Sequence, residues 1–288
     1  MRETTPATGA PRGPSRSQGL RVELLRDGAT VLRSGPFRAY LAVELLASGF
    51  LVVRRGPEML PLLALIFGGA AVAGFLAWAA GRMPGAHDGR DPVSAPRAEL
   101  AAIAVAYAGL SGSFLGWWPG GDWTSGWGVF RLALVAWSLV FAAGWVAGIV
   151  RGTPSLDPVA WIGRSWLPFW PLILAILAPK VPVQGLAIVG ATWGGLASGV
   201  VQQILLQVGL TSRLEAVLGR PDAAAVIAAG GFGAAHIAMN LPQAGGDWWI
   251  AAANAAVLQT TIGLVFCAAF LRHRAPLGLG FCHALLMA

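Results

Sequence analysis

The chain has 288 residues, of which 56% are hydrophobic and only 11% are charged, and its formal net charge is +7. A globular chain carries roughly 25% charged residues, so this composition excludes a soluble enzyme and a nucleic-acid-binding module. The mean hydropathy of +0.65 instead predicts a polytopic membrane protein, whose main partner is the membrane lipid.

Residues 1–36 form a polar segment rich in Pro, Gly, Ser, Thr and Arg. We expect a basic cytoplasmic tail there and not a cleavable signal peptide, because no short apolar core follows within the usual window. From residue 37 onward, apolar runs predict helices that cross the membrane, since a span needs roughly 20 residues. The predicted spans are 38–53, 59–81, 98–118, 128–150, 160–178, 185–210, 223–240 and 249–271.

A last apolar run over 277–288 is too short to cross a bilayer and predicts a half-length helix. The predicted fold is therefore all-α, a polytopic transmembrane bundle of about eight spans plus a short C-terminal half-helix. We divide it into N-terminal transmembrane helices over 37–159 and a second transmembrane part over 160–288, which carries the polar residues described below.

The loop arginines predict a multi-pass plasma-membrane protein with its N-terminus in the cytoplasm. With this orientation, outside loops 119–127 and 241–248 contain no Lys or Arg, and Lys180 is the chain's single lysine. Arg54 and Arg55 are the exceptions, since they fall on the outside. The cytoplasmic arginines beyond Arg38 are Arg82, Arg90, Arg97, Arg151, Arg213, Arg220, Arg272 and Arg274.

Polar side chains gather in the last third of the chain, within apolar runs. Gln203 and Gln207 share one helix face because they are four residues apart, whereas Gln202 lies about 100° around the helix. Phe232, His236 and Asn240 also recur every four residues, and His283 lies in the final run. Polar residues within membranes usually face a cavity or one another, which predicts a shared polar site. The alternative is ordinary hydrogen bonding between helices.

Three ordered motifs in residues 160–288 resemble those of a known family. Gln202-Gln203-x-x-x-Gln207 resembles a Glu-Glu-x-x-x-Arg motif, and Phe232-Gly-Ala-Ala-His236 matches Phe-x-x-x-His. A Gly-containing run, the basic loop 272–274, Pro276 and His283 follow the order of a third motif, His-x-x-x-Asn/Asp. The set is similar to the CPBP intramembrane proteases, which are type II CAAX prenyl endopeptidases or abortive-infection-like proteins.

The resemblance implies a bundle of about eight helices around a water-filled cavity that opens into the membrane. It implies that a first-motif glutamate activates water with help from the second-motif histidine, while the third-motif histidine and Asn/Asp hold the carbonyl oxygen. On this basis the candidate catalytic positions are Gln202, Gln203, Gln207, His236 and His283, with Phe232 and Asn240 in support. The family has been called metalloprotease, but we expect a glutamate mechanism without a bound metal, and no cofactor.

The chain departs from this pattern at the positions that carry the chemistry. Both glutamates and the arginine are replaced by Gln202, Gln203 and Gln207, and Met287 stands in place of the third-motif Asn/Asp. Glutamine preserves shape and hydrogen bonding, but an amide cannot accept a proton from water at neutral pH, and general-base catalysis typically supplies 10²–10⁴-fold in rate. Together, these changes predict that the site has lost its charges. They favour a pseudoenzyme.

Other residues offer weak substitutes for the missing base. Glu44 in the first span is the better candidate, whereas Glu99 and Glu215 are expected in interfacial, solvated positions. Cys282 and His283 point in different directions as adjacent helix residues and do not form a dyad. Two histidines with glutamine neighbours also lack the carboxylate or thiolate ligands that zinc or iron normally takes, so no metal site is predicted.

Three functions remain open, and whether the chain is an enzyme stays undecided between them. The favoured one is a CPBP-like membrane protein with impaired or absent proteolysis, which retains a polar cavity for a transmembrane or lipidated peptide, a lipid or a partner helix. The second is an active intramembrane endopeptidase with an unusual base. The third is a transporter-like or scaffold bundle whose polar residues only join its helices.

Overall fold

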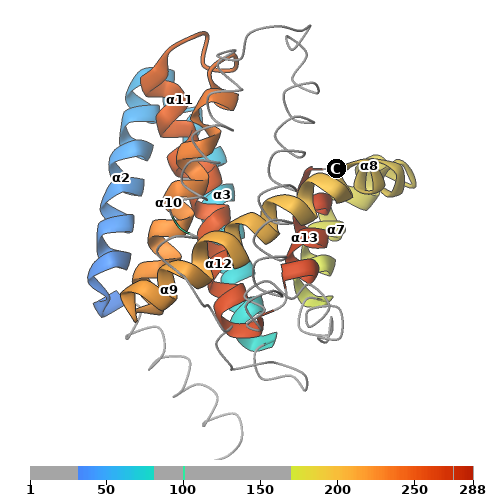
Figure 1. Ribbon diagram of the computed structural model, residues 1–288. Coiled ribbons are helices and arrows are strands. Elements are labelled where there is room, and N and C mark those ends of the chain that lie inside the picture. The colour runs from blue at the N-terminus through green and yellow to red at the C-terminus, as the bar shows by residue number, and fades with distance from the viewer. Residues whose placement is uncertain (1–31, 81–99, 101–169, 275, 288) are drawn as a thin grey trace, which may run out of the picture.

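The computed structural model describes residues 32–80, 100, 170–274 and 276–287, and within these ranges the secondary structure is helical without strands (Figure 1). Four of the described helices are long and apolar enough to cross a membrane: Gly35–Arg55, Met59–Leu76, Pro221–Asn240 and Trp248–His273. The shorter helix Pro276–Met287 is also apolar. These helices confirm the all-α class and indicate insertion into a membrane. The predicted spans 98–118 and 128–150, apart from residue 100, lie outside the described residues.

Helices α2 (Gly35–Arg55) and α3 (Met59–Ala80) match the first two predicted spans closely. Ser34 caps the N-terminus of α2, where its hydroxyl accepts a hydrogen bond from the N–H of Phe37. Gly56 ends α2 with φ 98°, a backbone conformation that favours glycine. Leu45 and Leu65 are more than 70% exposed, which suits helices whose outer faces contact lipid.

One long helical segment follows α7 (Trp170–Gln184), which ends farther along the chain than the predicted span 160–178. Gly185, with φ 55°, separates α7 from α8 (Ala187–Gln203). The helix then continues as the π-helix η2 (Ile204–Thr211) and as α9 (Ser212–Leu218). The predicted span 185–210 thus forms a helix, but that helix runs on to Leu218 and widens at η2.

The C-terminal helices agree with the remaining predicted elements. Helix α10 (Pro221–Asn240) corresponds to span 223–240. Helices α11 (Trp248–Asn254), η3 (Ala255–Thr260) and α12 (Thr261–His273) form one continuous rod over span 249–271, again with a π segment in its middle. Helix α13 (Pro276–Met287) is the predicted half-length helix.

Contacts between helix ends define the two sides of the bundle. At one side, the Ser34 hydroxyl donates to the Asp222 carboxylate over 2.7 Å. At the other, Arg54 forms an ion pair with Asp247 at 2.8 Å, and Arg55 donates to the carbonyl of Gln243 over 3.3 Å. The two arginines that depart from the positive-inside pattern are therefore next to acceptors in the cation-free loop 241–248.

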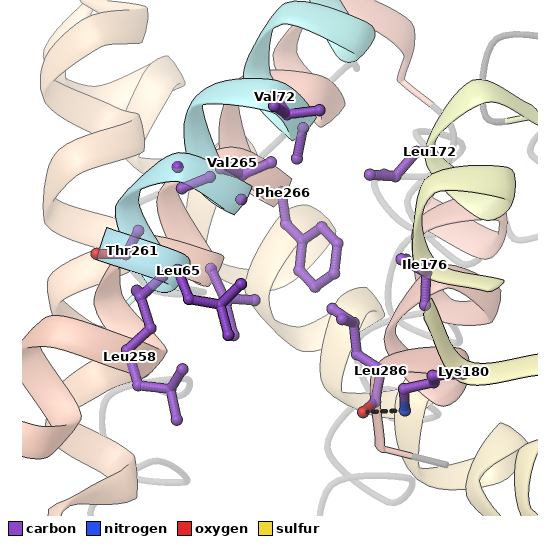
Figure 2. Close-up of a pocket in the computed structure, with 16 residues that line it drawn as sticks. Leu65, Val72, Leu172, Ile176, Lys180, Leu258, Thr261, Val265, Phe266 and Leu286 are labelled. Carbon is purple, nitrogen blue, oxygen red and sulfur yellow. Dashed lines mark hydrogen bonds between the residues drawn. The ribbon is translucent and has the colours of Figure 1, made fainter. Parts of the chain in front are cut away.

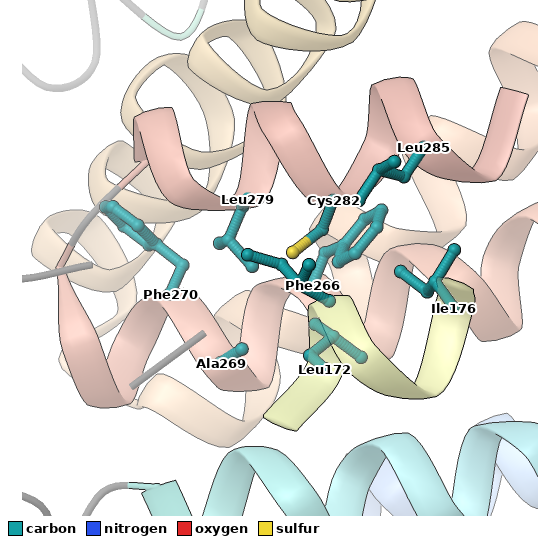
Figure 3. Close-up of a cluster of buried hydrophobic side chains, with 9 residues drawn as sticks. Leu172, Ile176, Phe266, Ala269, Phe270, Leu279, Cys282 and Leu285 are labelled. Carbon is teal, nitrogen blue, oxygen red and sulfur yellow. The ribbon is translucent and has the colours of Figure 1, made fainter. Parts of the chain in front are cut away.

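The core around the C-terminal half-helix is a cluster of apolar side chains from α7, α12 and α13 (Figure 3). Phe266 and Phe270 of α12 pack there with Leu279 and Cys282 of α13. Cys282 is fully buried, as expected for a small hydrophobic side chain. This packing fixes α13 against α12 and α7 and so sets the position of the neighbouring His283.

Helices α8 and α13 approach each other unusually closely through two glycines. A Cβ atom at Gly199 would lie 2.6 Å from the carbonyl oxygen of Gly280, and a Cβ atom at Gly280 would lie 2.6 Å from the Cα of Val200. Small residues at membrane-helix contacts permit this backbone approach. The contact places the end of α8, with Gln203, beside the middle of α13.

Asp247 provides a pH-dependent cap for the helical rod that begins at Trp248. Its carboxylate accepts hydrogen bonds from the N–H groups of Trp249 and Ile250 over 2.9 and 3.1 Å. The Ile250 N–H, followed by the Arg54 side chain, holds the pKa of Asp247 below its usual range. A lowered folded-state pKa stabilises the fold above the unfolded value of about 3.9, and that stabilisation is lost as pH falls through the folded value.

We therefore expect the Tm to decrease as the pH is lowered from about 5, and to decrease more in the wild type than in Asp247→Ala. Asp247→Asn keeps a side-chain oxygen that can cap the helix but removes the titrating charge. At neutral pH, the Tm of Asp247→Asn should therefore lie between those of the wild type and the alanine variant. Thermal unfolding at several pH values checks this, and parallel curves for the wild type and Asp247→Ala would contradict it.

Candidate intramembrane polar site

A continuous line of hydrogen bonds joins three of the sequence-predicted residues. Gln207 donates from Nε2 to Oε1 of Gln203 over 3.0 Å, and Nε2 of Gln203 lies 3.0 Å from Nδ1 of His283. Gln203 and Gln207 are both 0% exposed, and His283 is 7% exposed. The sequence predicted that the runs 185–210, 223–240 and 277–288 bring their polar side chains together, and these hydrogen bonds join the first run to the last. Gln202 is half-buried, in line with its different direction on the helix.

The order of donors along this line fixes the state of His283. Because Oε1 of Gln203 accepts from Gln207, its Nε2 group is the donor to His283. His283 Nδ1 therefore accepts, and a neutral ring carries its proton on Nε2. The amides of Gln203 and Gln207 thus orient an uncharged imidazole. In the motif that the sequence resembles, these two glutamine positions hold a glutamate and an arginine.

The line of hydrogen bonds continues into the π-helix η2. The Thr211 hydroxyl lies 3.3 Å from Oε1 of Gln207 and donates to the carbonyl of Leu206 over 2.7 Å. The Ser212 hydroxyl donates to the carbonyl of Gln207, five residues back, over 3.3 Å. Wide helical turns of this kind occur frequently at functional sites. Sequence reasoning did not single out Thr211, although it follows Gln207 at the same four-residue spacing.

The second predicted histidine joins this group through an aromatic side chain. The Phe232 ring lies 4.4 Å from the ring of His236 and 5.9 Å from the ring of His283, measured between centroids. His236 donates from Nδ1 to the carbonyl of Phe232 over 2.7 Å. A neutral His236 therefore keeps an unprotonated Nε2. Phe232 is buried and in contact with both histidine rings.

Asn240 lies farther along α10 and makes contacts of its own. Its Nδ2 donates to the carbonyl of His236 over 2.9 Å and to Oε1 of Gln259, in η3, over 3.2 Å. Asn240 therefore links α10 to the second π segment and has no hydrogen bond to Gln203 or His283. Met287, which replaces the third-motif Asn/Asp, ends α13 and is 44% exposed.

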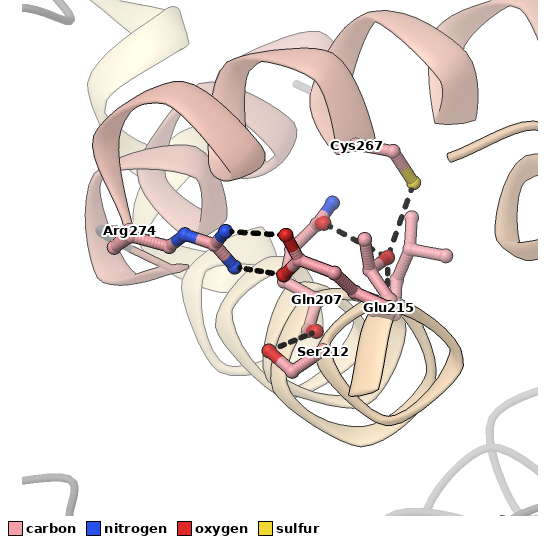
Figure 4. A network of polar contacts seen from close by, with 7 residues as sticks. Gln207, Ser212, Glu215, Cys267 and Arg274 are labelled. Atoms are coloured by element: carbon pink, nitrogen blue, oxygen red, sulfur yellow. Dashed lines mark hydrogen bonds and ion pairs between the residues drawn. The ribbon is translucent and has the colours of Figure 1, made fainter. Parts of the chain in front are cut away.

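An ion pair is buried at the base of the site (Figure 4). Arg274 donates from Nη2 to Oε1 of Glu215 over 3.0 Å, and its Nη1 lies 2.8 Å from Oε2. Glu215 is 4% exposed and Arg274 is 3% exposed. The prediction that Glu215 is an interfacial, solvated charge is therefore wrong. Its partner is 59 residues away in the chain, at the turn between α12 and α13, and no local pattern shows that contact.

The cysteines have no catalytic geometry. Cys267 and Cys282 are free and buried, and Cys267 Sγ lies 3.4 Å from the Thr211 hydroxyl. Cys282 packs in the apolar cluster of Figure 3, so it does not form a dyad with His283. Within the described ranges, no group of three or more His, Cys, Asp and Glu side chains could hold a metal ion.

No carboxylate is hydrogen-bonded to either histidine within the described part of the chain. Glu215 is paired with Arg274, and both oxygens of Glu44 are buried without a hydrogen-bond partner. Glu99, the other carboxylate considered from the sequence, lies outside the described residues. The site is thus neutral for two reasons. Its own side chains are amides and imidazoles, and the nearby described carboxylates do not bond to its histidines.

A largely apolar cavity of about 460 Å³ lies beside this group, between α3, α7, η3, α12 and α13 (Figure 2). Phe266 forms one of its walls and also packs against His283, with 5.6 Å between ring centroids. Lys180 lies at one end, where its ammonium donates to the carbonyls of Leu285 and Leu286 over 2.8 and 2.9 Å. The cavity walls contain none of the motif glutamines or histidines, so this cavity differs from the polar, water-filled one expected from the resemblance.

No family model, curated protein or solved structure matches the chain. The resemblance to the CPBP proteases therefore rests on the three motifs, and it stays a prediction.

Proposed function

We propose that this chain is a CPBP-like membrane protein that binds an apolar partner, a lipid acyl chain or a transmembrane segment, without cleaving it. The observation that carries the proposal is the hydrogen bond between Gln203 and Nδ1 of His283. An active site of this family would need a carboxylate there to take a proton from water. An amide offers no such basicity, while it keeps the imidazole in one orientation.

The apolar cavity supports the binding of an apolar partner. Its volume of about 460 Å³ falls within the roughly 300–1,000 Å³ typical of ligand pockets. Its walls are mostly aliphatic, and Phe266 connects it to His283. A partner that is already dissolved in the bilayer suits such walls because it exchanges one apolar surrounding for another.

One observation favours the alternative of an active endopeptidase with an unusual base. The Nδ1 of His236 is committed to the Phe232 carbonyl, so a neutral ring has a free lone pair on Nε2. Histidine is the commonest general base in enzymes. A cleavage test that includes a His236 variant therefore separates the two functions.

The cleavage arm of the test uses the purified chain in lipid nanodiscs with transmembrane and prenylated peptides. We expect no cleavage by the wild type. Cleavage that is lost in His236→Ala would overturn the non-catalytic proposal.

The binding arm uses a phospholipid and a transmembrane peptide, each carrying a photoactivatable group. We expect adducts on the cavity walls from at least one probe, and far fewer in Gly69→Leu. Gly69 lines the cavity and has no atom within 4 Å of its Cβ position, so a side chain can be added there to occupy part of the cavity. Gly74→Leu is the matched control, because Gly74 lies on the same helix, also has open space, and does not line the cavity. Equal labelling of both variants would contradict binding in this cavity.

A further inference from the structure

A second polar group lies on α2, apart from the glutamine and histidine site. Glu44 is 2% exposed, and neither of its carboxylate oxygens has a hydrogen-bond partner. The Oγ of Ser48, one turn farther along α2, is likewise buried without a hydrogen-bond partner. Residues four apart lie on the same helix face. Three oxygen atoms on one face of a membrane helix are therefore buried and unsatisfied.

Two hydroxyl groups border this carboxyl. Tyr40, one turn before Glu44, has its hydroxyl 2.9 Å from the hydroxyl of Thr261. Thr261 is also close to the Glu44 carboxyl, although the two do not meet hydrogen-bond geometry. It is the first residue of α12, directly after the π-helix η3, and it lines the apolar cavity (Figure 2). The group therefore consists entirely of oxygen atoms, from one carboxylate and three hydroxyls.

Among the residues that the structure describes, no positive side chain pairs with Glu44. Among the described helices, α3, α10, α11 and η3 pack most closely against α2, and α12 meets it through Thr261. The titratable residues of the first four are Asp222 and His236. Asp222 accepts a hydrogen bond from Ser34 and forms an ion pair with Arg220. His236 is hydrogen-bonded to the Phe232 carbonyl. Arg38 on α2 is six residues from Glu44, about 9 Å along the helix, and its side chain is exposed. The other basic residues of α2 and α12 are ten or more residues from Glu44 or Thr261, which is about 15 Å along a helix; they are Arg54, Arg55, Arg272 and His273.

We propose that Glu44, with the hydroxyls of Ser48, Tyr40 and Thr261, binds a monovalent metal cation of the sodium type. An ionised carboxylate buried in a membrane without a partner is costly. A hard cation takes oxygen ligands, and a single positive charge leaves the site neutral. A divalent ion would leave a net charge in the membrane. A proton could neutralise the carboxylate, but it would bond to one oxygen and leave the others unsatisfied.

Sodium binding is tested on the full chain in lipid nanodiscs at about pH 9, where protons compete least. NaCl is compared with choline chloride at equal ionic strength. We expect a saturable rise of Tm in NaCl alone and one ²²Na⁺ bound per chain. Both effects should disappear in Glu44→Gln, which is nearly isosteric and removes the charge. Glu44→Gln should unfold in choline chloride at the same Tm as the wild type or higher, which shows that it folds.

Matched variants locate the ion. Glu58→Gln, which removes an exposed carboxylate in the turn just before α3, should keep the full sodium effect. Thr261→Val should weaken sodium binding by about tenfold or more, and Thr261→Ser, which keeps the hydroxyl, should restore it. Equal Tm values in NaCl and choline chloride, or a sodium effect that persists in Glu44→Gln, would overturn the proposal and leave Glu44 as a protonated group. Loss of the effect in Glu58→Gln as well would assign sodium to the surface and overturn it too.

Discussion

Replacing Gly280 by alanine is expected to destabilise the protein by about 3 kcal/mol, the upper part of the range for overpacked contacts. The added methyl group would lie 2.6 Å from the Cα of Val200. A backbone atom cannot move aside as the end of a flexible side chain can, so α8 and α13 must separate. Gln203 and His283 lie four or fewer residues from this contact, and their hydrogen bond should lengthen or break.

Denaturant unfolding in micelles measures the loss of stability, and the ¹⁵N chemical shifts of the His283 ring report on its hydrogen bond. Gly190→Ala is the control, because Gly190 is on α8 and has nothing within 4 Å of its Cβ position. It should leave stability unchanged or raise it slightly, since alanine is the better helix former by roughly 0.5–1 kcal/mol. Similar losses in the two variants would show that the α8–α13 contact does not depend on glycine.

The helices themselves were predictable from composition, because an apolar run of membrane length has few structures open to it. The runs at 59–81 and 223–240 coincide with α3 and α10 within a few residues. Their boundaries depend on local chemistry that a sequence displays, such as the Ser34 cap and Gly56 at the ends of α2. The continuous helix from Ala187 to Leu218 is longer than the predicted span, which ended at residue 210. The residues beyond 210 are too polar for a lipid-facing helix, but other helices bury several of them.

The π segments could not be predicted in the same way. Residues 204–211 are as apolar as the preceding helix, and no periodicity in them distinguishes a wide turn from an ordinary one. The hydroxyls of Thr211 and Ser212, bonded to carbonyls five residues back, are the local feature that accompanies the widening. Such hydroxyls are common in membrane helices, so they indicate a π-helix only after the carbonyl partner is known.

The site was predictable to the extent that it depends on helix geometry. The four-residue spacing of Gln203 and Gln207 placed them on one face, and they are hydrogen-bonded. The tertiary contacts of residues outside the three motifs were missed. Tyr40 meets Thr261 across 221 residues, and Arg274 meets Glu215 across 59. Charged residues near the end of an apolar run were expected in solvent, but neighbouring helices cover Glu215 and Arg274 instead.

Replacing Glu215 by glutamine is expected to destabilise the protein by about 3–5 kcal/mol, because it leaves the Arg274 guanidinium buried without its carboxylate. Glutamine has nearly the same volume, so the loss reports charge and not packing. The effect should also reach the site, since Glu215 and Arg274 hold the turn before α13 against the end of η2 and α9 (Figure 4). Denaturant unfolding measures the cost, and Glu58→Gln, at an exposed position, should change stability little.

A double variant separates two quantities: the contribution of the intact ion pair to stability, and the stability lost when only one partner is removed. Removing both charges together, in Glu215→Leu with Arg274→Met, should recover most of the stability lost in either single variant. Apolar residues of similar volume often replace a buried ion pair at little cost. A double-mutant cycle with a coupling energy near zero would contradict this, since residues in contact normally show 0.5–3 kcal/mol. Recovery of stability without recovery of the His283 ring shifts would mean that the ion pair positions α13 through its geometry and not only through its energy.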